Sequence, residues 1–126
     1  MNLPVLTIAS GNQKKVSEIS EMLDVLSLRV EKQPDYLNVE ETGNTYFENA
    51  LLKAKAAALE TKTWALADDS GLEVDILDCR PGIYSARYAK NNAEKIKKLI
   101  NELSDSPYRS ARFISCMVLC DPSGNL

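Results

Sequence analysis

Two adjacent carboxylates, Asp68 and Asp69, follow an apolar run and precede Ser70 and Gly71, so groups able to handle a metal ion or a phosphate are concentrated there. The residues on either side favour strands, whereas Asp, Ser and Gly favour the turn between two strands. We therefore predict that the acid pair lies at the end of a strand. Consecutive strand side chains point to opposite faces, so one carboxylate faces a given site and the other supports it.

A second polar segment, Ser10 to Lys15, follows the apolar run Pro4–Ala9 and precedes residues 16–26, whose apolar positions recur at helical spacing. This order predicts a strand, a tight turn and the start of a helix. Free N–H groups and the positive dipole end of a helix attract anions, and Lys14 and Lys15 add positive charge. Spacing alone leaves open whether these lysines bind phosphate or are solvated residues of an ordinary strand–helix connection.

A third polar segment, Glu40 to Gly43, precedes a helix that we predict from Thr45 to Lys62, because Thr45 and Glu48 have the spacing of a capping box. Asn49 and Lys53 lie four residues apart, so they share a helix face that could look toward Glu41. The alternative interpretation is that these charges form a solvated surface.

Elements later in the chain have to hold these segments in place. Residues 80–89 contain a Pro-Gly turn and predict a structured loop, in which Arg87 either binds an anion or pairs with an acid. A helix is expected over residues 91–103 with an apolar stripe inside, followed by a strand over residues 109–120 that is apolar, and therefore covered, on both faces. Asp121–Asn125 predicts a turn toward a partner strand. Early alternation of strands and helices indicates an α/β architecture with mixed strand order.

Composition narrows the chemistry further. The 126 residues suit one domain, residues 1–126, and a net charge of −3 with a pI of about 5.0 gives no footprint for nucleic acid or an anionic membrane. The chain contains no histidine, which removes imidazole bases and His-based zinc sites. Cys79, Cys116 and Cys120 are expected to be reduced core thiols of a cytoplasmic protein. Met1–Leu6 has no basic leader character, and no apolar segment is long enough to span a membrane.

Together the three polar segments suit a nucleotide polyphosphate with Mg²⁺, which prefers carboxylates, water and phosphate oxygens. At this point the chain resembles the Ham1-like, or inosine triphosphate pyrophosphatase, family. The resemblance is carried by Ser10-Gly11-Asn12-Gln13-Lys14-Lys15, by Glu40-Glu41-Thr42-Gly43 with Phe47-Glu48-Asn49-Ala50 and Lys53-Ala54, and by Ala67-Asp68-Asp69-Ser70-Gly71-Leu72 with Pro81-Gly82-Ile83-Tyr84-Ser85-Ala86-Arg87-Tyr88.

The resemblance implies a Mg²⁺-dependent pyrophosphatase that cleaves ITP, dITP and XTP between the α- and β-phosphates, giving the monophosphate and pyrophosphate and removing deaminated purines. It also implies a homodimer and an elongated mixed-sheet α/β fold of the Ham1 type, related to anticodon-binding-like and Maf-like folds, with an active-site cleft. From the net charge we expect no nucleic-acid or membrane partner.

Roles are carried over at matching positions only. The resemblance makes Asp69 the base that activates water and, with Glu41, a magnesium ligand, while Asp68 supports the site. It makes Asn12 and Lys15 the main side-chain ligands of the triphosphate. The full set of substrate-binding residues that it implies is Ser10, Gly11, Asn12, Gln13, Lys14, Lys15, Lys53 and Ser70.

Family members continue through a Phe-Gly-Tyr-Asp-Pro segment and a late Ser-His-Arg segment that read the base, and this sequence contains neither. We therefore expect an N-terminal portion of the fold, with the C-terminal part missing, and the reaction type is better supported than the substrate. Asp78-Cys79-Arg80 also departs from the glycine-rich family pattern, which affects local loop shape. Three alternatives stay open: a nucleotide-binding module without turnover, a pyrophosphatase for other modified or pyrimidine nucleotides, and a small α/β domain with unspecialised surface charge.

Overall fold

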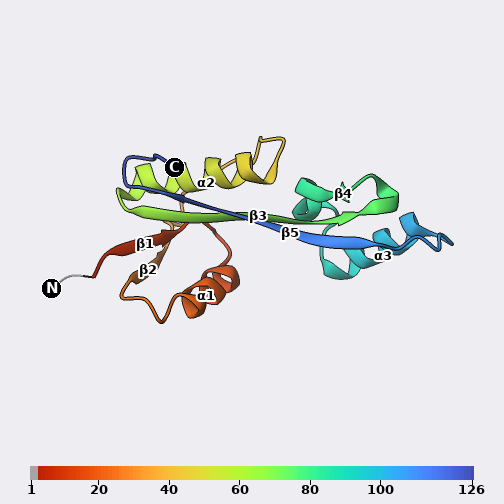
Figure 1. Ribbon diagram of the computed structural model, residues 1–126, viewed down its shortest axis with the longest axis horizontal. Helices are drawn as coiled ribbons and strands as arrows, with labels where there is room; N and C mark the ends of the chain where they lie inside the picture. The colour runs from red at the N-terminus through yellow and green to blue at the C-terminus, as the bar shows by residue number, and fades with distance from the viewer. Residues whose placement is uncertain (1–2) are drawn as a thin grey trace. The chain divides into compact units, whose positions relative to one another are not determined.

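The computed structural model describes residues 3–126, and their contacts divide into two units. The first unit comprises the chain up to Asp68 together with Met117–Leu126, and the second comprises Asp69–Cys116. Met1 and Asn2, the first residues of the segment Met1–Leu6 considered above, lie outside the described residues. The helices and strands, labelled in Figure 1, are β1 (Val5–Ile8), α1 (Gln13–Met22), β2 (Arg29–Lys32), α2 (Tyr46–Thr61), β3 (Trp64–Val74), β4 (Arg80–Pro81), α3 (Asn92–Leu103) and β5 (Ala111–Cys120), with 3₁₀ helices η1 (Asp75–Leu77) and η2 (Gly82–Arg87).

The strands form one mixed sheet in the order β2-β1-β3-β4, and β5 pairs with β3. β1 runs parallel to both β2 and β3, whereas β4 runs antiparallel to β3. Parallel neighbours need a crossover connection, and here the helix α1 connects β1 to β2. The predicted α/β architecture with mixed strand order is therefore confirmed.

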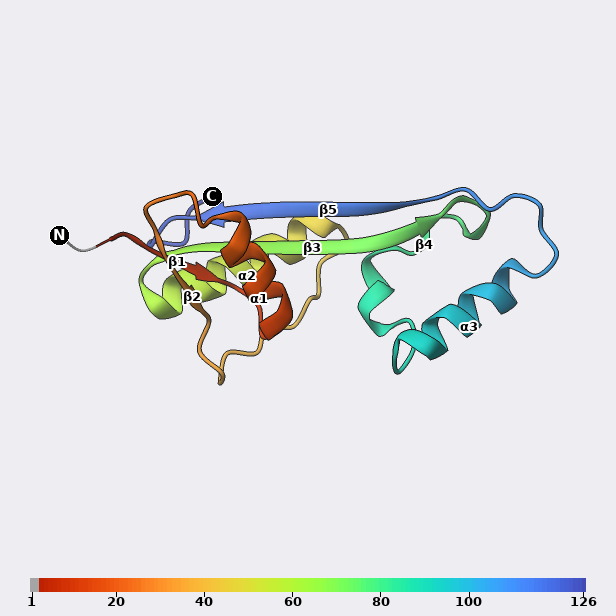
Figure 2. The same ribbon diagram turned by 90° about the horizontal axis from the view of Figure 1, so that it is seen from below.

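In the first unit, α1 and α2 lie on opposite faces of the sheet (Figures 1 and 2). Val16 and Ile19 of α1 pack with Leu6 and Ile8 of β1 in one apolar cluster. The buried face of α2 is made only of small residues apart from Asn49, which lets the helix backbone approach its neighbours closely; its fully buried alanines are Ala50, Ala54, Ala57 and Ala58. The core of the first unit therefore fixes both helices on the sheet.

The caps of α2 agree with the predicted bounds. The Oγ1 of Thr45 accepts a hydrogen bond from the N–H of Glu48 at 3.0 Å, while a carboxylate oxygen of Glu48 accepts one from the N–H of Asn44 at 2.6 Å. Lys62 ends the helix in the left-handed conformation, with φ of 57°. The predicted helix Thr45–Lys62 is confirmed, including its first turn beside the acid segment.

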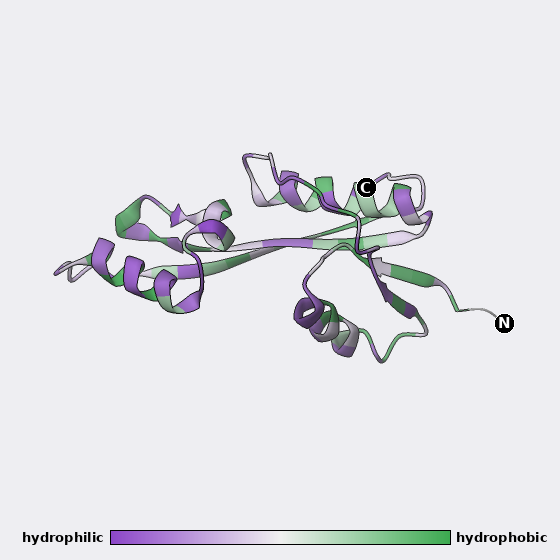
Figure 3. Cartoon of the chain, turned by 180° about the vertical axis from the view of Figure 1, so that it is seen from behind, coloured by the Kyte–Doolittle hydropathy of each residue, from purple (hydrophilic) through white to green (hydrophobic). Residues whose placement is uncertain are grey.

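The predicted turn at Asp68–Gly71 is wrong, because β3 runs unbroken for 11 residues from Trp64 to Val74. Pairing with β5 supplies backbone partners to β3, and this tertiary pairing overrides the local turn preference of Asp, Ser and Gly. Figure 3 shows a hydrophilic band within the long central strand. The parallel neighbour β1 does stop here, since its register ends at Ile8 opposite Leu66. Asp68 thus lies just past the end of β1, although β3 continues.

The second unit also departs from expectation. Ile76, one of the residues after the acid pair that favour a strand, lies in the 3₁₀ helix η1, whereas α3 begins as predicted, with Asn91 accepting a hydrogen bond from the N–H of Glu94 at 2.9 Å. The stripe of α3 was predicted to be buried, yet Ile96 and Ile100 are more than half exposed, and none of the residues of α3 is fully buried among the described residues.

Two smaller expectations also fail. One face of β5 is exposed over the described residues, with Phe113 at 84% exposure. The buried residues of this strand, Val118 and Cys120, both lie on the opposite face. Cys79 is an exposed turn residue with φ of 66° and not a core thiol, while Cys120 is buried and all three cysteines are free. Burial raises the pKa of the Cys120 thiol. Within residues 3–126, no helix combines the length and apolar character that crossing a bilayer requires.

Candidate functional site

The start of α1 is organised by its own side chains. The Oδ1 of Asn12 accepts hydrogen bonds from the N–H groups of Lys14 and Lys15, at 3.0 and 3.3 Å, so Asn12 is the N-cap. The hydroxyl of Ser10 accepts the N–H of Asn12 at 3.1 Å. The predicted strand, turn and helix start are therefore present, and the cap uses the amide oxygen of Asn12 and not its nitrogen.

The backbone over this turn is open. A Cβ added at Gly11 would meet its nearest neighbour, the side-chain nitrogen of Gln33, at 3.9 Å. Gln13 and Lys14 are exposed beside it. A phosphate group therefore has room to approach the backbone of this turn. The family resemblance predicts that the triphosphate binds here.

Lys15 joins the first turn of α1 to the middle of β3. Its Nζ lies 2.9 Å from the Oδ1 of Asp68, whose side chain is only 13% exposed. Asp68 therefore holds in place a lysine that the family resemblance assigns to substrate binding. Because of this ion pair, Lys15 is not simply a solvated lysine of an ordinary strand–helix connection.

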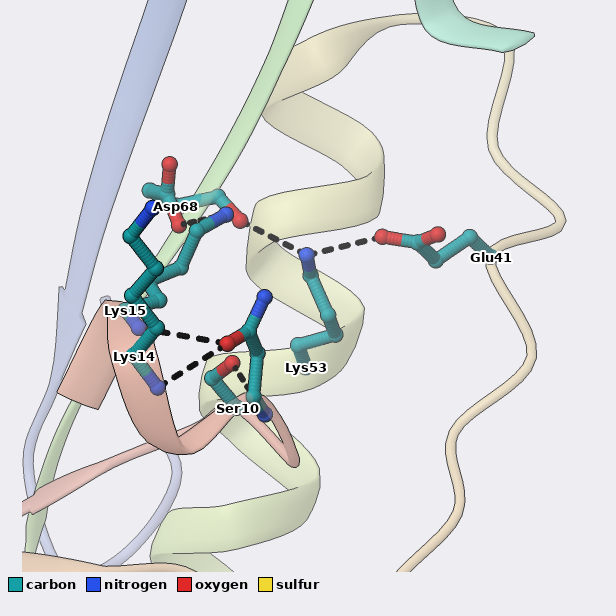
Figure 4. Close-up of polar contacts among 7 residues, drawn as sticks. Ser10, Lys14, Lys15, Glu41, Lys53 and Asp68 are labelled. Atoms are coloured by element: carbon teal, nitrogen blue, oxygen red, sulfur yellow. Dashed lines mark hydrogen bonds and ion pairs between the residues drawn. The ribbon is translucent and has the colours of Figure 1, made fainter. Parts of the chain in front are cut away.

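Lys53 joins α2 to the acid segment and to β3 (Figure 4). Its Nζ lies 2.7 Å from the Oε1 of Glu41 and donates a 2.6 Å hydrogen bond to the backbone oxygen of Asp68. The side chains of Lys53 and Glu41 are 18% and 26% exposed, so this pair is not a solvated surface. Glu40 and Lys55 are exposed, and for them the solvated interpretation holds.

The segment that carries Glu41 is held by Asn49, a residue that sequence reasoning placed on the correct helix face without giving it a role. Its Oδ1 accepts the N–H of Gly43 at 2.7 Å, and its side chain is 1% exposed. A Cβ at Gly43 would lie 2.6 Å from the Cβ of Glu48 and 2.7 Å from that same oxygen, so only glycine fits. In the sequence, the four-residue spacing of Thr45, Asn49 and Lys53 along one helix face was the signal that could have indicated this role of Asn49.

The site in the first unit thus contains two lysines and two carboxylates whose charges cancel: Lys15, Lys53, Glu41 and Asp68 (Figure 4). Carboxylate oxygens suit Mg²⁺, and the described residues contain no cluster of three or more His, Cys, Asp or Glu that would hold an ion by themselves. This donor set therefore fits a magnesium ion that takes one or two carboxylates and completes its shell with water and phosphate.

Asp69 and Ser70 open the second unit. Asp69 is buried, whereas Asp68 is partly exposed, as expected for consecutive strand residues on opposite faces. Ser70 is exposed and lines a cavity of about 350 Å³.

Arg87 was expected either to bind an anion or to pair with an acid. Its guanidinium lies 6.0 Å from the ring centroid of Tyr84.

Comparison with known proteins adds to this geometry. The Ham1 family model matches residues 6–126. A dITP/XTP pyrophosphatase of Synechococcus sp. is 52% identical over 122 residues, which cover 97% of this chain and 59% of that protein. Another of the same name, from Geobacter sulfurreducens, is 48% identical over 94% of this chain and 64% of its own length.

Solved structures agree with these matches. A HAM1 protein from Coxiella burnetii superposes with a TM-score of 0.87 at 38% identity, covering 98% of this chain and 66% of that one. A nucleoside-triphosphatase, or dITP/XTP pyrophosphatase, from Mycobacterium abscessus has a TM-score of 0.77 at 36% identity, with 96% and 66% covered. The predicted fold class is confirmed, and the chain spans 59% and 64% of the length of the two curated relatives.

Proposed function

Because the chain belongs to the Ham1 family, we propose that it carries the phosphate-binding and hydrolytic portion of a nucleoside triphosphate pyrophosphatase. The observation that carries this proposal is the arrangement of Lys15 and Lys53 around Asp68, with Glu41 paired to Lys53. Two ammonium groups held by carboxylates form a site that is neutral in the free protein and can rearrange to bind a polyanion.

The two lysines act by exchanging partners. In the free protein their charge is balanced by Asp68 and Glu41, so no isolated charge is desolvated. A triphosphate would take the ammonium group of Lys53 from Glu41, which leaves that carboxylate for a divalent cation, and would share the ammonium group of Lys15 with Asp68. The open backbone at Gly11 and the N-terminus of α1 would receive further phosphate oxygens.

The proposal includes Mg²⁺ as the cofactor, with Glu41 of this set and Asp69, the residue after Asp68 on β3, as its carboxylate ligands. When bound, it supplies charge neutralisation to the phosphates and makes a water molecule more acidic. Asp69 would accept the proton of the attacking water, Asp68 would keep Lys15 in position, and Ser70 would contact the substrate. Little proton affinity is demanded of Asp69, which suits a carboxylate as base.

The proposed substrates are non-canonical purine nucleotides, namely dITP, XTP and ITP, which are cleaved to the monophosphate and pyrophosphate. This choice follows the names of the relatives, two of which are dITP/XTP pyrophosphatases. The proposal extends to a homodimer in the cytoplasm that has no nucleic-acid partner, in keeping with the acidic composition.

The proposal is tested by pyrophosphate release in the natural full-length protein, using dITP, XTP, dGTP and a pyrimidine triphosphate with Mg²⁺. Release from dITP and XTP well above dGTP supports it. Tight binding of dITP without pyrophosphate would favour a binding module, and preference for the pyrimidine nucleotide would favour a different modified substrate.

A further inference from the structure

The cavity beside Ser70 in the second unit contains a hydroxyl that the proposed reaction has not used. The cavity is lined by β3, by η2 and by α3, and its lining includes Ser70, Leu72 and Ser85. Its walls are otherwise mainly apolar, from Ile96, Leu99 and Phe113 among others. Ser85 is therefore a polar group of η2 in this lining, and it contacts Leu72, which lies two residues along β3 from Ser70.

Ser85 lies where the pairing between β3 and β4 stops. Glu73 is opposite Pro81 and Val74 is opposite Arg80, so one more step of this antiparallel register would place Gly82 opposite Leu72. The strand ends instead at Pro81, and Gly82, with φ of 54°, turns the chain into η2. The backbone of Leu72 thus loses the partner that a longer β4 would give it.

The hydroxyl of Ser85 replaces that partner. It accepts the N–H of Leu72 at 2.9 Å and donates to the backbone oxygen of Gly82 at 2.6 Å. The donor and the acceptor that would pair directly in a longer ladder are therefore bridged by one side-chain oxygen. This bridge continues the support of β3 to a point just beyond Asp69 and Ser70.

The segment that carries Ser85 is itself braced at both ends by α3. Tyr88 donates a 2.6 Å hydrogen bond to Glu102, and the guanidinium of Arg80 lies 3.2 Å from the other oxygen of that carboxylate. The Nζ of Lys98 donates to the backbone oxygen of Tyr88 at 3.1 Å. Because residues 80 and 88 are both tied to Glu102, the bridge at Ser85 rests on a fixed support.

We infer that Ser85 is a positioning residue for the hydrolysis, which fixes the β3 backbone at Leu72 and thereby the placement of Asp69 and Ser70. This role rests on the proposed pyrophosphatase activity. Loss of the hydroxyl leaves the N–H of Leu72 and the oxygen of Gly82 without a partner, and β3 loosens next to the base. Since Lys15 and Lys53 lie in the first unit, the effect falls mainly on kcat through Asp69, and KM changes by a smaller factor through Ser70.

The experiment compares Ser85→Ala, Ser85→Thr and Ser110→Ala in the natural full-length protein, with dITP and Mg²⁺. Ser110 is the matched control, because it contacts Asp75 only through its backbone oxygen, which alanine keeps. Ser85→Ala is expected to lower kcat about 10- to 100-fold, Ser85→Thr to restore most of it, and Ser110→Ala to match the parent. Amide hydrogen exchange at Leu72 should speed up in Ser85→Ala alone.

A parent-like kcat in folded Ser85→Ala would overturn the inference. It would also be overturned if Ser85→Thr lost as much kcat as Ser85→Ala while its Leu72 amide stayed protected from hydrogen exchange. If Ser85→Ala does not fold, Ser85→Cys decides, because it keeps the size of the side chain and weakens both hydrogen bonds. A lowered kcat with a smaller change in KM in that variant supports the inference, and parent-like kcat overturns it. A parent protein that releases no pyrophosphate would contradict the proposed function itself, which distinguishes the two failures.

Discussion

The Nζ of Lys53 lies 2.7 Å from the Oε1 of Glu41, which links the middle of α2 to a segment that has no secondary structure of its own. The same ammonium donates to the backbone oxygen of Asp68. One side chain therefore joins the acid segment, the helix and β3, and its replacement should affect all three.

Lys53→Ala should weaken dITP binding about 10- to 100-fold, because it removes a charged donor to phosphate and leaves Glu41 without its cation. Lys55→Ala is the matched control, since Lys55 is exposed on the same helix. Isothermal titration with a non-hydrolysable triphosphate measures the difference. Equal binding by both variants would contradict the phosphate role of Lys53.

Magnesium dependence should follow Glu41 and not its neighbour. Glu41→Gln is expected to raise the Mg²⁺ concentration for half-maximal activity about tenfold or more, while Glu40→Gln, at an exposed position, leaves it unchanged. Removal of Mg²⁺ by a chelator should abolish turnover in the parent. Full activity in the chelator would refute the metal assignment.

Substitutions at Gly43 and Gly11 should have different effects, the first on the stability of the fold and the second on nucleotide binding. Gly43→Ala forces a Cβ to within 2.7 Å of Asn49 and is expected to lower the free energy of unfolding by about 1–3 kcal/mol. Gly11→Ala meets open space, so its stability should stay within about 0.5 kcal/mol of the parent while nucleotide affinity falls. Urea denaturation and nucleotide titration distinguish the two, and a stable Gly43→Ala variant would contradict the close packing.

Tyr88→Phe should isolate the hydroxyl that donates to Glu102, because the ring that lies 4.3 Å from the Nζ of Lys98 is kept. Burial, with the hydrogen bond to Glu102, raises the pKa of Tyr88 from 10.0 to about 12, so the fold favours the protonated hydroxyl. Its stabilisation, about 1 kcal/mol, is complete below pH 10.0 and declines as the pH rises through about 12.

The hydrogen bond from Tyr88 also lowers the pKa of Glu102 below 4.5, so that carboxylate stabilises the fold above pH 4.5 and its contribution is lost as the pH falls through the lowered pKa. Denaturant titrations across the pH range should show the largest difference between parent and Tyr88→Phe near neutral pH. A constant difference at all pH values would show that the hydroxyl is not the cause.

The sequence predicted the helices well and the strand context poorly. Caps at Thr45 and Asn91 are local signals, and both helices begin where these residues place them. The turn expected at Asp68–Gly71 failed because pairing with β5, distant in sequence, keeps β3 extended. The exposure of Phe113 likewise depends on what lies over β5, which periodicity cannot reveal.

The site was predictable at the level of residue types. The spacing of Asn49 and Lys53 indicated a helix face that could look toward Glu41, and the 2.7 Å distance between the Nζ of Lys53 and the Oε1 of Glu41 shows that these two side chains meet. The partner of Lys15 was not predictable, because it depends on which carboxylate of β3 faces α1. The hydrogen bonds of Ser85 to Leu72 and Gly82 were not predictable either, since they depend on where β4 ends. The roles of Asp69 and Ser70 stay predictions.

The most direct measurement is pyrophosphate release from dITP with Mg²⁺ by the natural full-length protein and by its Asp69→Asn variant. We predict release by the parent and a loss of about a hundredfold or more in the variant. Undiminished release by Asp69→Asn would contradict the assignment of the base, and no release by the folded parent would contradict the pyrophosphatase itself.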